Sequence, residues 1–367
     1  MADIELRGIT KIFDKKVRAV NDVSLTIADE EFMVLLGPSG CGKTTLMRMI
    51  AGLEYPEAGR VVIGDRDVTD LPPRKRDISM VFQSYAVFPH LTVFDNIAFG
   101  LKMQKINKTE IKRRTEEAAG LVQLSPYLER YSAQLSGGQR QRVAVARAIV
   151  MEPSVLLMDE PLSNLDALLR LNFRAELKRL VADLKTTTIY VTHDQIEAMS
   201  LGDRIAVMRE GQIVQCGTPM EVYEHPATEF VGGFLGSPPM NFLKVRLESV
   251  DGELRAMLGE HGLPAPATLA GHGSPDVLLG IRAENIEAIP LDGQAEHGGL
   301  VSQTLVVELL GSQMLVTGEI GDQQIKVLVR ADAPIKAGDA LVLRPEADKL
   351  RWFDAGLGHA IAGPATG

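Results

Sequence analysis

Several features that define other classes of protein are missing from this sequence. The 367 residues contain no apolar run near the roughly 18 residues needed to cross a bilayer. The first twenty residues carry Asp3, Glu5 and Arg7 among their apolar positions, so they do not form a signal peptide. We therefore expect the protein to stay in the cytosol and to perform any membrane work through a separate partner.

The sequence also has few cysteines and no net positive charge. The two cysteines, Cys41 and Cys216, are too few for a disulfide framework and lack metal-ligand spacing. The formal net charge of −9 argues against sequence-independent binding of nucleic acid, which needs a basic face. We expect no nucleic-acid partner, although a glycine-rich loop could still bind an anionic ligand through its backbone.

The order of apolar segments predicts two domains. Residues 1–236 alternate short apolar strands with amphipathic helices, which is typical of an α/β domain around a largely parallel sheet. Glycines and prolines cluster between residues 232 and 239, where we place the boundary. The predicted strands include 32–36, 155–158, 188–191 and 204–208, and the predicted helices include 43–51, 109–121, 138–150 and 167–184.

Residues 237–367 have a different pattern. They contain short alternating segments separated by turns and no convincing long helix, which predicts a small all-β barrel or sandwich. The predicted strands are 242–250, 277–281, 305–309, 324–329 and 340–344. The fold class expected for the whole chain is an α/β phosphate-loop domain followed by a small all-β domain.

A glycine-rich loop follows the apolar segment 32–36. GPSGCGKT fits the phosphate-loop pattern G-x-x-x-x-G-K-[ST], in which glycines let successive N–H groups point at phosphate oxygens. Lys43 is predicted to contact the β- and γ-phosphates of a nucleoside triphosphate, and Thr44 to offer its hydroxyl to Mg²⁺. The residues predicted to bind the nucleotide here are Gly37, Pro38, Ser39, Gly40, Cys41, Gly42, Lys43, Thr44 and Thr45.

Two adjacent acids end the predicted strand 155–158. Asp159 would lie beside the loop and hold Mg²⁺ through its water shell. Glu160, one residue later, is placed to orient or deprotonate an attacking water. Two roles for two adjacent acids indicate hydrolysis rather than phosphoryl transfer to a second substrate.

A second glycine pair occurs in the segment LSGGQ, residues 135–139. Ser136 is typical of an N-cap, and Gly137 and Gly138 expose N–H groups where the next helix begins. The segment predicts a second anion site in a chain that already has one. Both sites could bind one γ-phosphate if two copies of the domain faced each other head to tail.

Together these motifs resemble the ATP-binding subunits of ABC transporters over the whole first domain. Residues 37–44 match the Walker A loop, 156–160 match Walker B with its catalytic acid, and 135–139 match the signature motif. The resemblance implies ATP and Mg²⁺ as ligands and an ATPase that works as a dimer. It also implies the fold of this family, an ABC ATPase domain followed by an OB-like regulatory and dimerisation domain.

The resemblance assigns roles to further residues. His193 is the switch histidine and joins Glu160 as a catalytic residue, and Phe13 stacks on adenine. Gln83 matches the Q-loop and is implied in binding both nucleotide and metal, next to Thr44 and Asp159. The remaining nucleotide contacts that the resemblance implies are Ser136, Gly137, Gly138, Gln139 and Asp166. The apolar residues 85–88 after Gln83 correspond to the region that contacts a membrane subunit.

The second domain narrows the resemblance to the maltose and glycerol-3-phosphate importers. The residues that carry it are 236–243, 280–285 and 350–354, although Ala283 and Asn285 depart from the family pattern. The resemblance implies a second copy of the chain, two integral membrane permease subunits and an extracytoplasmic solute-binding protein as partners. It implies a peripheral position on the cytoplasmic face of the inner membrane. It also implies that ATP hydrolysis by the chain energises import of a sugar, oligosaccharide or glycerol phosphate. Polyamine, iron or phosphonate importers, and a soluble ABC ATPase of repair or translation, remain alternatives.

Overall fold

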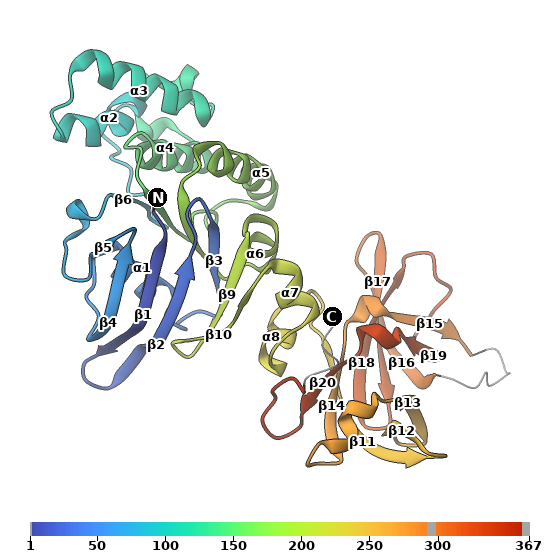
Figure 1. Cartoon of the computed structure of the whole chain (residues 1–367). Coiled ribbons are helices and arrows are strands. Elements are labelled where there is room, and N and C mark those ends of the chain that lie inside the picture. Colours follow the sequence, from blue (N-terminus) through green and yellow to red (C-terminus); the bar gives the residue numbers. More distant parts are fainter. Residues whose placement is uncertain (1, 292–298, 362–367) are drawn as a thin grey trace. The chain divides into compact units, whose positions relative to one another are not determined.

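The computed structural model describes residues 2–291 and 299–361 and divides the chain into two compact units, Met1–Pro219 and Met220–Gly367. Figure 1 shows the elements of each unit. The predicted boundary followed residue 236, whereas this division falls earlier and leaves the helix α8 (Glu229–Phe234) in the second unit. The physical reason is that Arg282 donates to the carbonyls of Tyr223 and Gly232, which ties this helical segment to the second unit. Residues 362–367 of the predicted second domain lie outside the described residues.

A six-stranded sheet forms the centre of the first unit, in the order β10-β9-β3-β8-β7-β6. Its neighbours pair in parallel except for β10, which pairs antiparallel with β9. Every residue of β3, β7 and β8 is buried, including Thr187, Thr188 and Thr192 of β8, as is typical of the central strands of a parallel sheet. The strands are β3 (Phe32–Leu36), β6 (Ile78–Val81), β7 (Val155–Asp159), β8 (Thr187–Thr192), β9 (Arg204–Arg209) and β10 (Gln212–Gly217). The four predicted strands of this sheet are confirmed.

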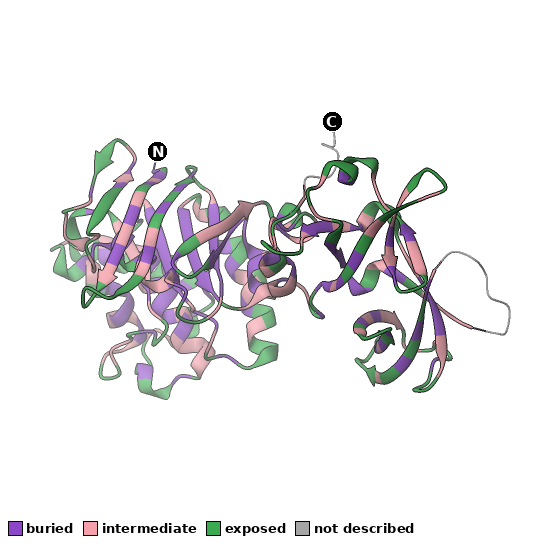
Figure 2. Cartoon of the chain, turned by 90° about the horizontal axis from the view of Figure 1, so that it is seen from below, coloured by how far each residue is buried: buried purple, intermediate pink, exposed green. Residues whose placement is uncertain are grey.

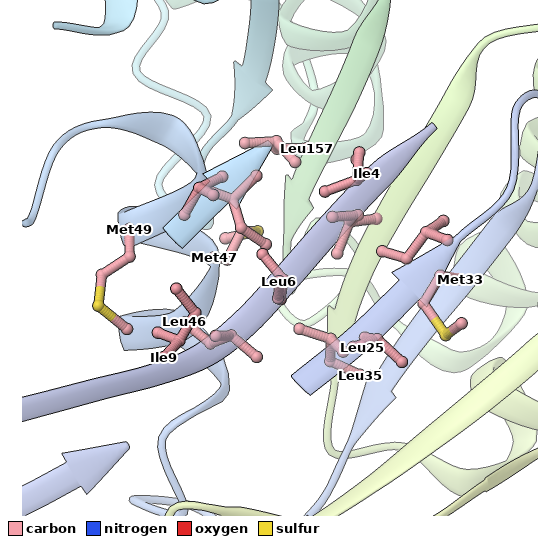
Figure 3. Close-up of a cluster of buried hydrophobic side chains, with 14 of the residues drawn as sticks. Ile4, Leu6, Ile9, Leu25, Met33, Leu35, Leu46, Met47, Met49 and Leu157 are labelled. Atoms are coloured by element: carbon pink, nitrogen blue, oxygen red, sulfur yellow. The ribbon is translucent and has the colours of Figure 1, made fainter. Parts of the chain in front are cut away.

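A four-stranded antiparallel sheet, in the order β2-β1-β4-β5, was not predicted. Its strands are β1 (Ile4–Phe13), β2 (Val17–Ile27), β4 (Ala58–Ile63) and β5 (Arg66–Asp67). Leu6 and Leu25 of this sheet share one buried cluster with Leu35 of β3, Leu46 of the helix that follows the phosphate loop, and Leu157 of β7 (Figure 3). The two sheets and that helix therefore bury their apolar faces in a common core.

The helices of the first unit begin at side-chain caps, with one exception. Thr92, Asn107, Ser136, Asp166 and Asp194 each accept a backbone N–H in the first turn of the helix that follows. The exception is the helix after the phosphate loop, whose cap is a glycine. The helices are α1 (Lys43–Ala51), α2 (Val93–Met103), α3 (Lys108–Leu121), α4 (Gly137–Ile149), α5 (Ala167–Leu184) and α6 (Gln195–Leu201).

The second unit contains two antiparallel five-stranded sheets, which agrees with the all-β pattern predicted for residues 237–367. One has the order β13-β12-β11-β14-β20, and the other β15-β19-β16-β17-β18. Both contribute to one apolar cluster, and buried residues line the strands (Figure 2). The strands are β11 (Asn241–Val250), β12 (Glu253–Leu258), β13 (His261–Pro264), β14 (Asp276–Ile281), β15 (Ile286–Pro290), β16 (Leu300–Leu309), β17 (Gln313–Ile320), β18 (Gln323–Arg330), β19 (Ala340–Pro345) and β20 (Arg351–Asp354).

The helices α7 (Pro219–Glu224) and α8 are six residues long each.

Across residues 2–291 and 299–361, no helix combines the length and apolar character that a membrane crossing requires.

Candidate nucleotide site

The phosphate loop connects the end of β3 to the start of α1, and two of its glycines have no room for a side chain. A Cβ on Gly37 would lie 2.3 Å from the carbonyl oxygen of Met208. A Cβ on Gly42 would lie 2.3 Å from the carbonyl oxygen of Ala19, and its φ of 106° is one that side chains rarely adopt. The neighbouring backbone therefore requires glycine at both positions of the predicted motif.

Lys43 lies inside this loop, where it is only 5% exposed. Its ammonium donates to the carbonyls of Gly37 at 2.7 Å and Pro38 at 2.9 Å. Its Nζ also lies 3.8 Å from the sulfur of the buried Cys41. Since Gly42 supplies no side-chain cap, the first N–H groups of α1 are left for another acceptor. The ammonium and the uncapped helix start fit a bound phosphate.

Thr44 and Asp159 come together as predicted from positions 115 residues apart. The Thr44 hydroxyl donates to the Asp159 carboxylate at 3.1 Å. Asp159 is 7% exposed, and this burial raises the pKa of its carboxyl group, with a smaller contribution from the nearby charge of Glu160. A hydroxyl and a carboxylate side by side are hard oxygen donors of the kind that Mg²⁺ prefers. These residues therefore fit the predicted Mg²⁺ ion, whose remaining ligands would be water and phosphate oxygens.

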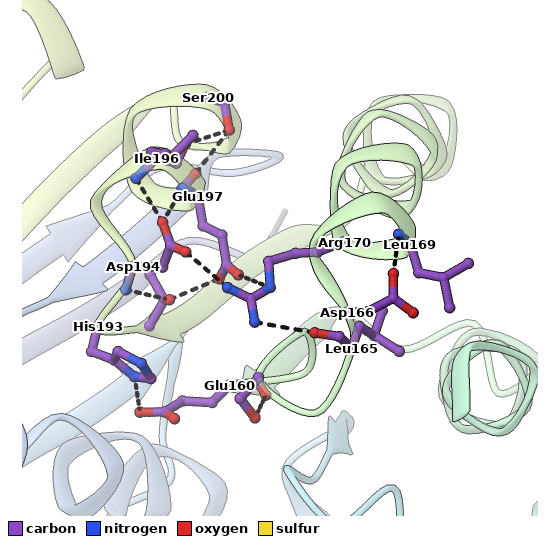
Figure 4. Close-up of polar contacts among 12 residues, drawn as sticks. Glu160, Leu165, Asp166, Leu169, Arg170, His193, Asp194, Ile196, Glu197 and Ser200 are labelled. Atoms are coloured by element: carbon purple, nitrogen blue, oxygen red, sulfur yellow. Dashed lines mark hydrogen bonds and ion pairs between the residues drawn. The ribbon is translucent and has the colours of Figure 1, made fainter. Parts of the chain in front are cut away.

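Glu160 follows β7 in the left-handed backbone region, with a φ of 44°. Its N–H donates to the carbonyl of Val191, at the end of β8, at 3.0 Å. The carboxylate contacts two predicted site residues. The Gln83 amide donates to one of its oxygens at 3.3 Å. Nδ1 of His193 lies 3.2 Å from the other oxygen (Figure 4). The side chain of His193 is 54% exposed. Glu160 is thus fixed beside the Thr44 and Asp159 pair with its carboxylate in reach of solvent.

The signature segment forms the predicted helix start. Ser136 accepts the N–H of Gln139 at 3.3 Å, and the Gln139 side chain accepts the N–H of Ser136 at 3.0 Å, which is a capping box. Ser136, Gly138 and Gln139 line a cleft of about 570 Å³ together with residues of α5. Among the described residues, no recorded hydrogen bond or ion pair joins Ser136 or Gln139 to the phosphate loop of the same chain.

Phe13 and Asp166 are the other predicted contacts. Phe13 ends β1 and is 36% exposed as a residue, and Nζ of Lys11 lies 5.2 Å from its ring centroid. Asp166 caps α5 by accepting the N–H of Leu169 at 2.9 Å. Some of the predicted residues thus form one group joined by direct contacts, namely the phosphate loop, Gln83, Asp159, Glu160 and His193. The others, Phe13, the signature segment and Asp166, lie at separate positions.

Sequence reasoning missed Arg170, which joins two loops of the site (Figure 4). Its guanidinium donates to the carbonyl of Leu165 at 3.2 Å and to the Asp194 carboxylate at 3.3 Å. It also lies 4.0 Å from Glu197, a 2% exposed residue whose carboxyl pKa is raised by burial. The cap pattern of Asp194 and Glu197 after His193 is visible in the sequence. No local pattern points to Arg170, because only the fold brings it to these residues.

Family comparisons match three segments of the chain. Residues 20–163 match the family described as ABC transporter, residues 236–286 the MalK OB fold domain, and residues 279–353 the TOBE domain. The predicted fold class, an ABC ATPase domain followed by an OB-like β domain, is therefore confirmed.

Curated relatives match over nearly the whole chain. An sn-glycerol-3-phosphate import ATP-binding protein of Cupriavidus pinatubonensis is 48% identical over 98% of this chain and 100% of its own length. A trehalose/maltose import ATP-binding protein of Thermococcus litoralis is 48% identical over the same shares. An oligosaccharides import ATP-binding protein of Bacillus subtilis is 47% identical over 97% of this chain and 98% of its own length. These names agree with the main function predicted, energising solute import, and not with the alternatives.

Solved structures agree for the first unit. The dimeric structure of the bacterial ABC transporter cassette MJ0796 is 31% identical, covers 59% of this chain and 98% of its own, and has a TM-score of 0.54. A post-hydrolysis state of the same cassette, bound to ADP and Pi, is 30% identical with a TM-score of 0.53. The chain therefore belongs to the ABC transporter family, as an ATPase of the import ATP-binding proteins that carry a MalK-type OB fold and a TOBE domain.

Proposed function

We propose that two copies of this chain close on ATP and hydrolyse it to drive uptake of a sugar, oligosaccharide or glycerol phosphate through partner permease subunits. The observation that supports this most directly is the position of the Glu160 carboxylate. It lies between the Gln83 amide and the His193 imidazole, one residue after an aspartate that is hydrogen-bonded to the phosphate loop.

Lys43, Thr44 and Asp159 bind the phosphates of ATP and the Mg²⁺ ion. The Lys43 ammonium, now donating to two loop carbonyls, turns to the β- and γ-phosphates of ATP. The Thr44 hydroxyl and the Asp159 carboxylate hold Mg²⁺, directly or through water. When bound, that ion neutralises charge that develops on the phosphates.

Glu160 orients the attacking water and accepts its proton. Its carboxylate is suited to this because two neighbours fix it while part of it stays accessible. His193 binds the γ-phosphate. Gln83 contacts the nucleotide from the opposite side of the Glu160 carboxylate. The reaction yields ADP and phosphate with water as the nucleophile.

The second copy completes the site. In the capping box the N–H of Gln139 donates to Ser136, while those of Gly137 and Gly138 lie at the start of α4, where a helix terminus favours an anion. We assign Ser136, Gly137, Gly138 and Gln139 to the ATP held by the other chain, with Asp166 at the same contact and Phe13 stacked on adenine. The dimeric structure of the similar cassette MJ0796 supports this arrangement.

The proposed location is the cytoplasmic face of the inner membrane, as a peripheral subunit. The partners are two integral permease subunits, met through the segment after Gln83, and an extracytoplasmic solute-binding protein. The names of the relatives support a sugar or glycerol phosphate as the solute. The sequence pattern places the end of the catalytic domain at residue 236, whereas the compact division places it after Pro219. In either case we assign regulation and dimerisation to residues 237–367.

Two measurements test the proposal. The purified full-length chain should hydrolyse ATP with Mg²⁺ and lose this activity with EDTA or in Lys43→Ala. Co-expressed with permease subunits and a solute-binding protein in membrane vesicles, it should support ATP-dependent uptake of glycerol 3-phosphate, maltose or trehalose. ATP hydrolysis without uptake of any of the three would contradict the proposed solute class, and absence of hydrolysis would contradict the proposed chemistry.

A further inference from the structure

Two consecutive residues after Gln83 have a backbone conformation that side chains rarely adopt. Tyr85 has a φ of 63° and Ala86 a φ of 47°, both in the left-handed region. That region brings Cβ close to a carbonyl oxygen and is populated mainly by glycine, asparagine and aspartate. Strain of this kind persists only where other contacts hold it, and it concentrates at functional sites. The contacts that hold this pair therefore matter.

One side chain binds the carbonyls of both strained residues. Arg147 donates to the carbonyl of Ala86 at 2.6 Å and to that of Tyr85 at 3.3 Å. Its guanidinium carbon also lies 5.5 Å from the ring centroid of Phe88. The guanidinium group is a rigid planar fork, so it fixes the two carbonyls and the ring relative to one another.

The position of Arg147 is not explained by an acidic partner in the part of the chain that the structure describes. Burial lowers the pKa of Arg147, and among the described residues no carboxylate opposes that shift. The half-buried guanidinium is therefore directed to backbone carbonyls and an aromatic ring, although a surface arginine would ordinarily stay in water.

The two ends of the segment are fixed by other elements. The amide of Asn164 donates to the carbonyl of Gln83 at 2.9 Å. At the other end, the fully buried Asn96 of α2 accepts the N–H of Phe88 at 2.9 Å and donates to the Phe88 carbonyl at 3.0 Å. Arg147 holds the strained middle from a different helix, α4, and lies in the last turn of that helix. The first turn of α4 carries Ser136 and Gln139.

We propose that Arg147 is a positioning residue that couples movement of α4 to the conformation of residues 85–88. The inference rests on the proposed function, in which the start of α4 meets the ATP of the second copy and residues 85–88 meet a permease subunit. Because one rigid helix carries both contacts, displacement of its first turn on closure displaces the guanidinium as well. The strained pair then changes its conformation at the surface that faces the membrane partner.

Hydrogen exchange of the full-length chain tests this coupling directly. The N–H of Tyr85 donates to the carbonyl of Phe82 at 2.9 Å, so peptides covering residues 84–90 report the state of the segment. Adding Mg²⁺ and a non-hydrolysable ATP analogue should change their exchange in the wild type. Arg147→Ala should raise the exchange about tenfold and remove the response to the analogue. Affinity for the analogue should stay within about twofold, because Arg147 lies outside the direct contacts around the phosphate loop.

A strain-relieving variant separates coupling from general damage. Glycine adopts a positive φ without cost, so Ala86→Gly in the Arg147→Ala background should bring exchange of residues 84–90 back toward the wild type. Arg147→Lys, which keeps the charge but loses the fork, should lie between the wild type and Arg147→Ala. The matched control is Arg113→Ala on α3, an arginine that is exposed and paired with Glu110 and Glu117. It should change nothing in this segment.

The possible outcomes separate a failure of the proposed coupling from a failure of the proposed function. Unchanged exchange in Arg147→Ala, or no recovery in the double variant, overturns the role of Arg147. If the wild type fails to bind the analogue, the proposed function fails, while basal exchange of wild type and Arg147→Ala still decides whether Arg147 holds the segment. If Arg147→Ala does not fold, the same comparison is made with Arg147→Lys and its Ala86→Gly partner.

Discussion

Nδ1 of His193 lies 3.2 Å from Oε1 of Glu160, while the other carboxylate oxygen of Glu160 accepts from the Gln83 amide. One carboxylate thus contacts two loops that are far apart in the sequence. This arrangement fixes the orientation of the carboxylate before any substrate arrives. A variant that keeps the shape of this side chain but removes its charge therefore isolates the role of the charge.

We predict that Glu160→Gln lowers the rate of ATP hydrolysis by about 10²- to 10⁴-fold while ATP affinity is retained. The amide has the shape of the carboxylate but cannot accept the proton of an attacking water. The measurement is steady-state ATPase activity together with ATP binding by isothermal titration calorimetry.

Glu210→Gln is the matched control, since this glutamate is exposed and pairs with Arg209 at the surface. It should hydrolyse ATP at the wild-type rate. Glu160→Gln activity within a few-fold of the wild type would show that another group activates the water.

Asp159 supports a prediction about pH. Burial raises the pKa of Asp159 above its ordinary value of 3.8, so its charged form is disfavoured in the nucleotide-free protein. Its contribution to folding stability is then largest below pH 3.8 and is lost as the pH rises through the raised pKa. At neutral pH, nucleotide-free Asp159→Asn should therefore melt no lower than the wild type.

Binding of Mg²⁺ requires the same group in its charged form. The affinity advantage of the wild type over Asp159→Asn for Mg²⁺-ATP should therefore be full at neutral pH and should shrink as the pH falls through the raised pKa toward 3.8. Calorimetry of both proteins across pH measures this ratio, which cancels the titration of ATP itself. A ratio that does not change with pH would argue against a role for the Asp159 carboxylate in metal binding.

The parallel sheet could be predicted from sequence because β3 and most of β7 are continuous apolar runs, and β8 and β9 have apolar centres. Phe32–Leu36 and Lys43–Ala51 have the predicted bounds, since a glycine ends the helix at residue 52 in the left-handed conformation. The antiparallel sheet was missed because β1 and β2 carry register shifts, the first of them between Leu6 and Ile9. Such bulges break the two-residue alternation that reveals a strand.

The site was predictable where motifs are local, and not where contacts are long-range. The phosphate loop and the Ser136 cap are recognisable over a few residues. By contrast, Arg147 binds carbonyls about sixty positions away along the chain, and Arg170 joins segments that only the fold brings together. The glycine- and proline-rich stretch near residue 236 marks a turn, but it does not reveal that Tyr223 is bound by Arg282.

Mixed dimers test the assignment of the signature segment to the second copy. Ser136→Arg removes a cap, which costs about 1 kcal/mol, and places a bulky cation at the start of α4. It should block the ATP site of the partner chain and leave its own phosphate loop able to bind ATP. In dimers of one Ser136→Arg chain and one Lys43→Ala chain, the intact loop and the intact signature segment are on opposite chains.

The two arrangements predict different results for this mixture. If the sites are shared, the Ser136→Arg loop meets the normal signature segment of the Lys43→Ala chain, and one active site per dimer forms. If each chain completes its own site, both sites of the mixed dimer are inactive. ATPase activity of the mixture above the sum of the two separate variants would support sharing, and activity equal to that sum would contradict it.

Arg170 should affect turnover more than binding. It connects the carbonyl of Leu165, next to Asp166, with Asp194, next to His193. Arg170→Ala should lower kcat by about 10- to 100-fold because loop placement suffers, while ATP affinity is retained. Arg170→Lys should recover part of the loss. Arg179→Ala, on the same helix and paired only at the surface with Asp183, is the control. An equal loss of affinity and kcat would indicate general damage instead.

The last prediction concerns where the catalytic domain ends. The compact division falls after Pro219, whereas the sequence places it after residue 236. Val222, Val231 and Leu235 are fully buried in the whole chain and belong to the second unit. A chain ending at residue 236 keeps these side chains without the unit to which they belong, and exposing each costs about 1.5–3 kcal/mol of burial.

A chain ending at residue 219 should therefore remain monodisperse in gel filtration, bind ATP with wild-type affinity and melt in one transition. A chain ending at residue 236 should bind ATP as well but self-associate through its exposed apolar helices, with an apparent mass that rises with concentration. Replacing Val222, Val231 and Leu235 by serine in the longer chain should restore monodispersity. If instead the chain ending at 236 behaves well and the one ending at 219 aggregates or loses ATP binding, the helices α7 and α8 are part of the catalytic unit and the boundary near residue 236 is the correct one.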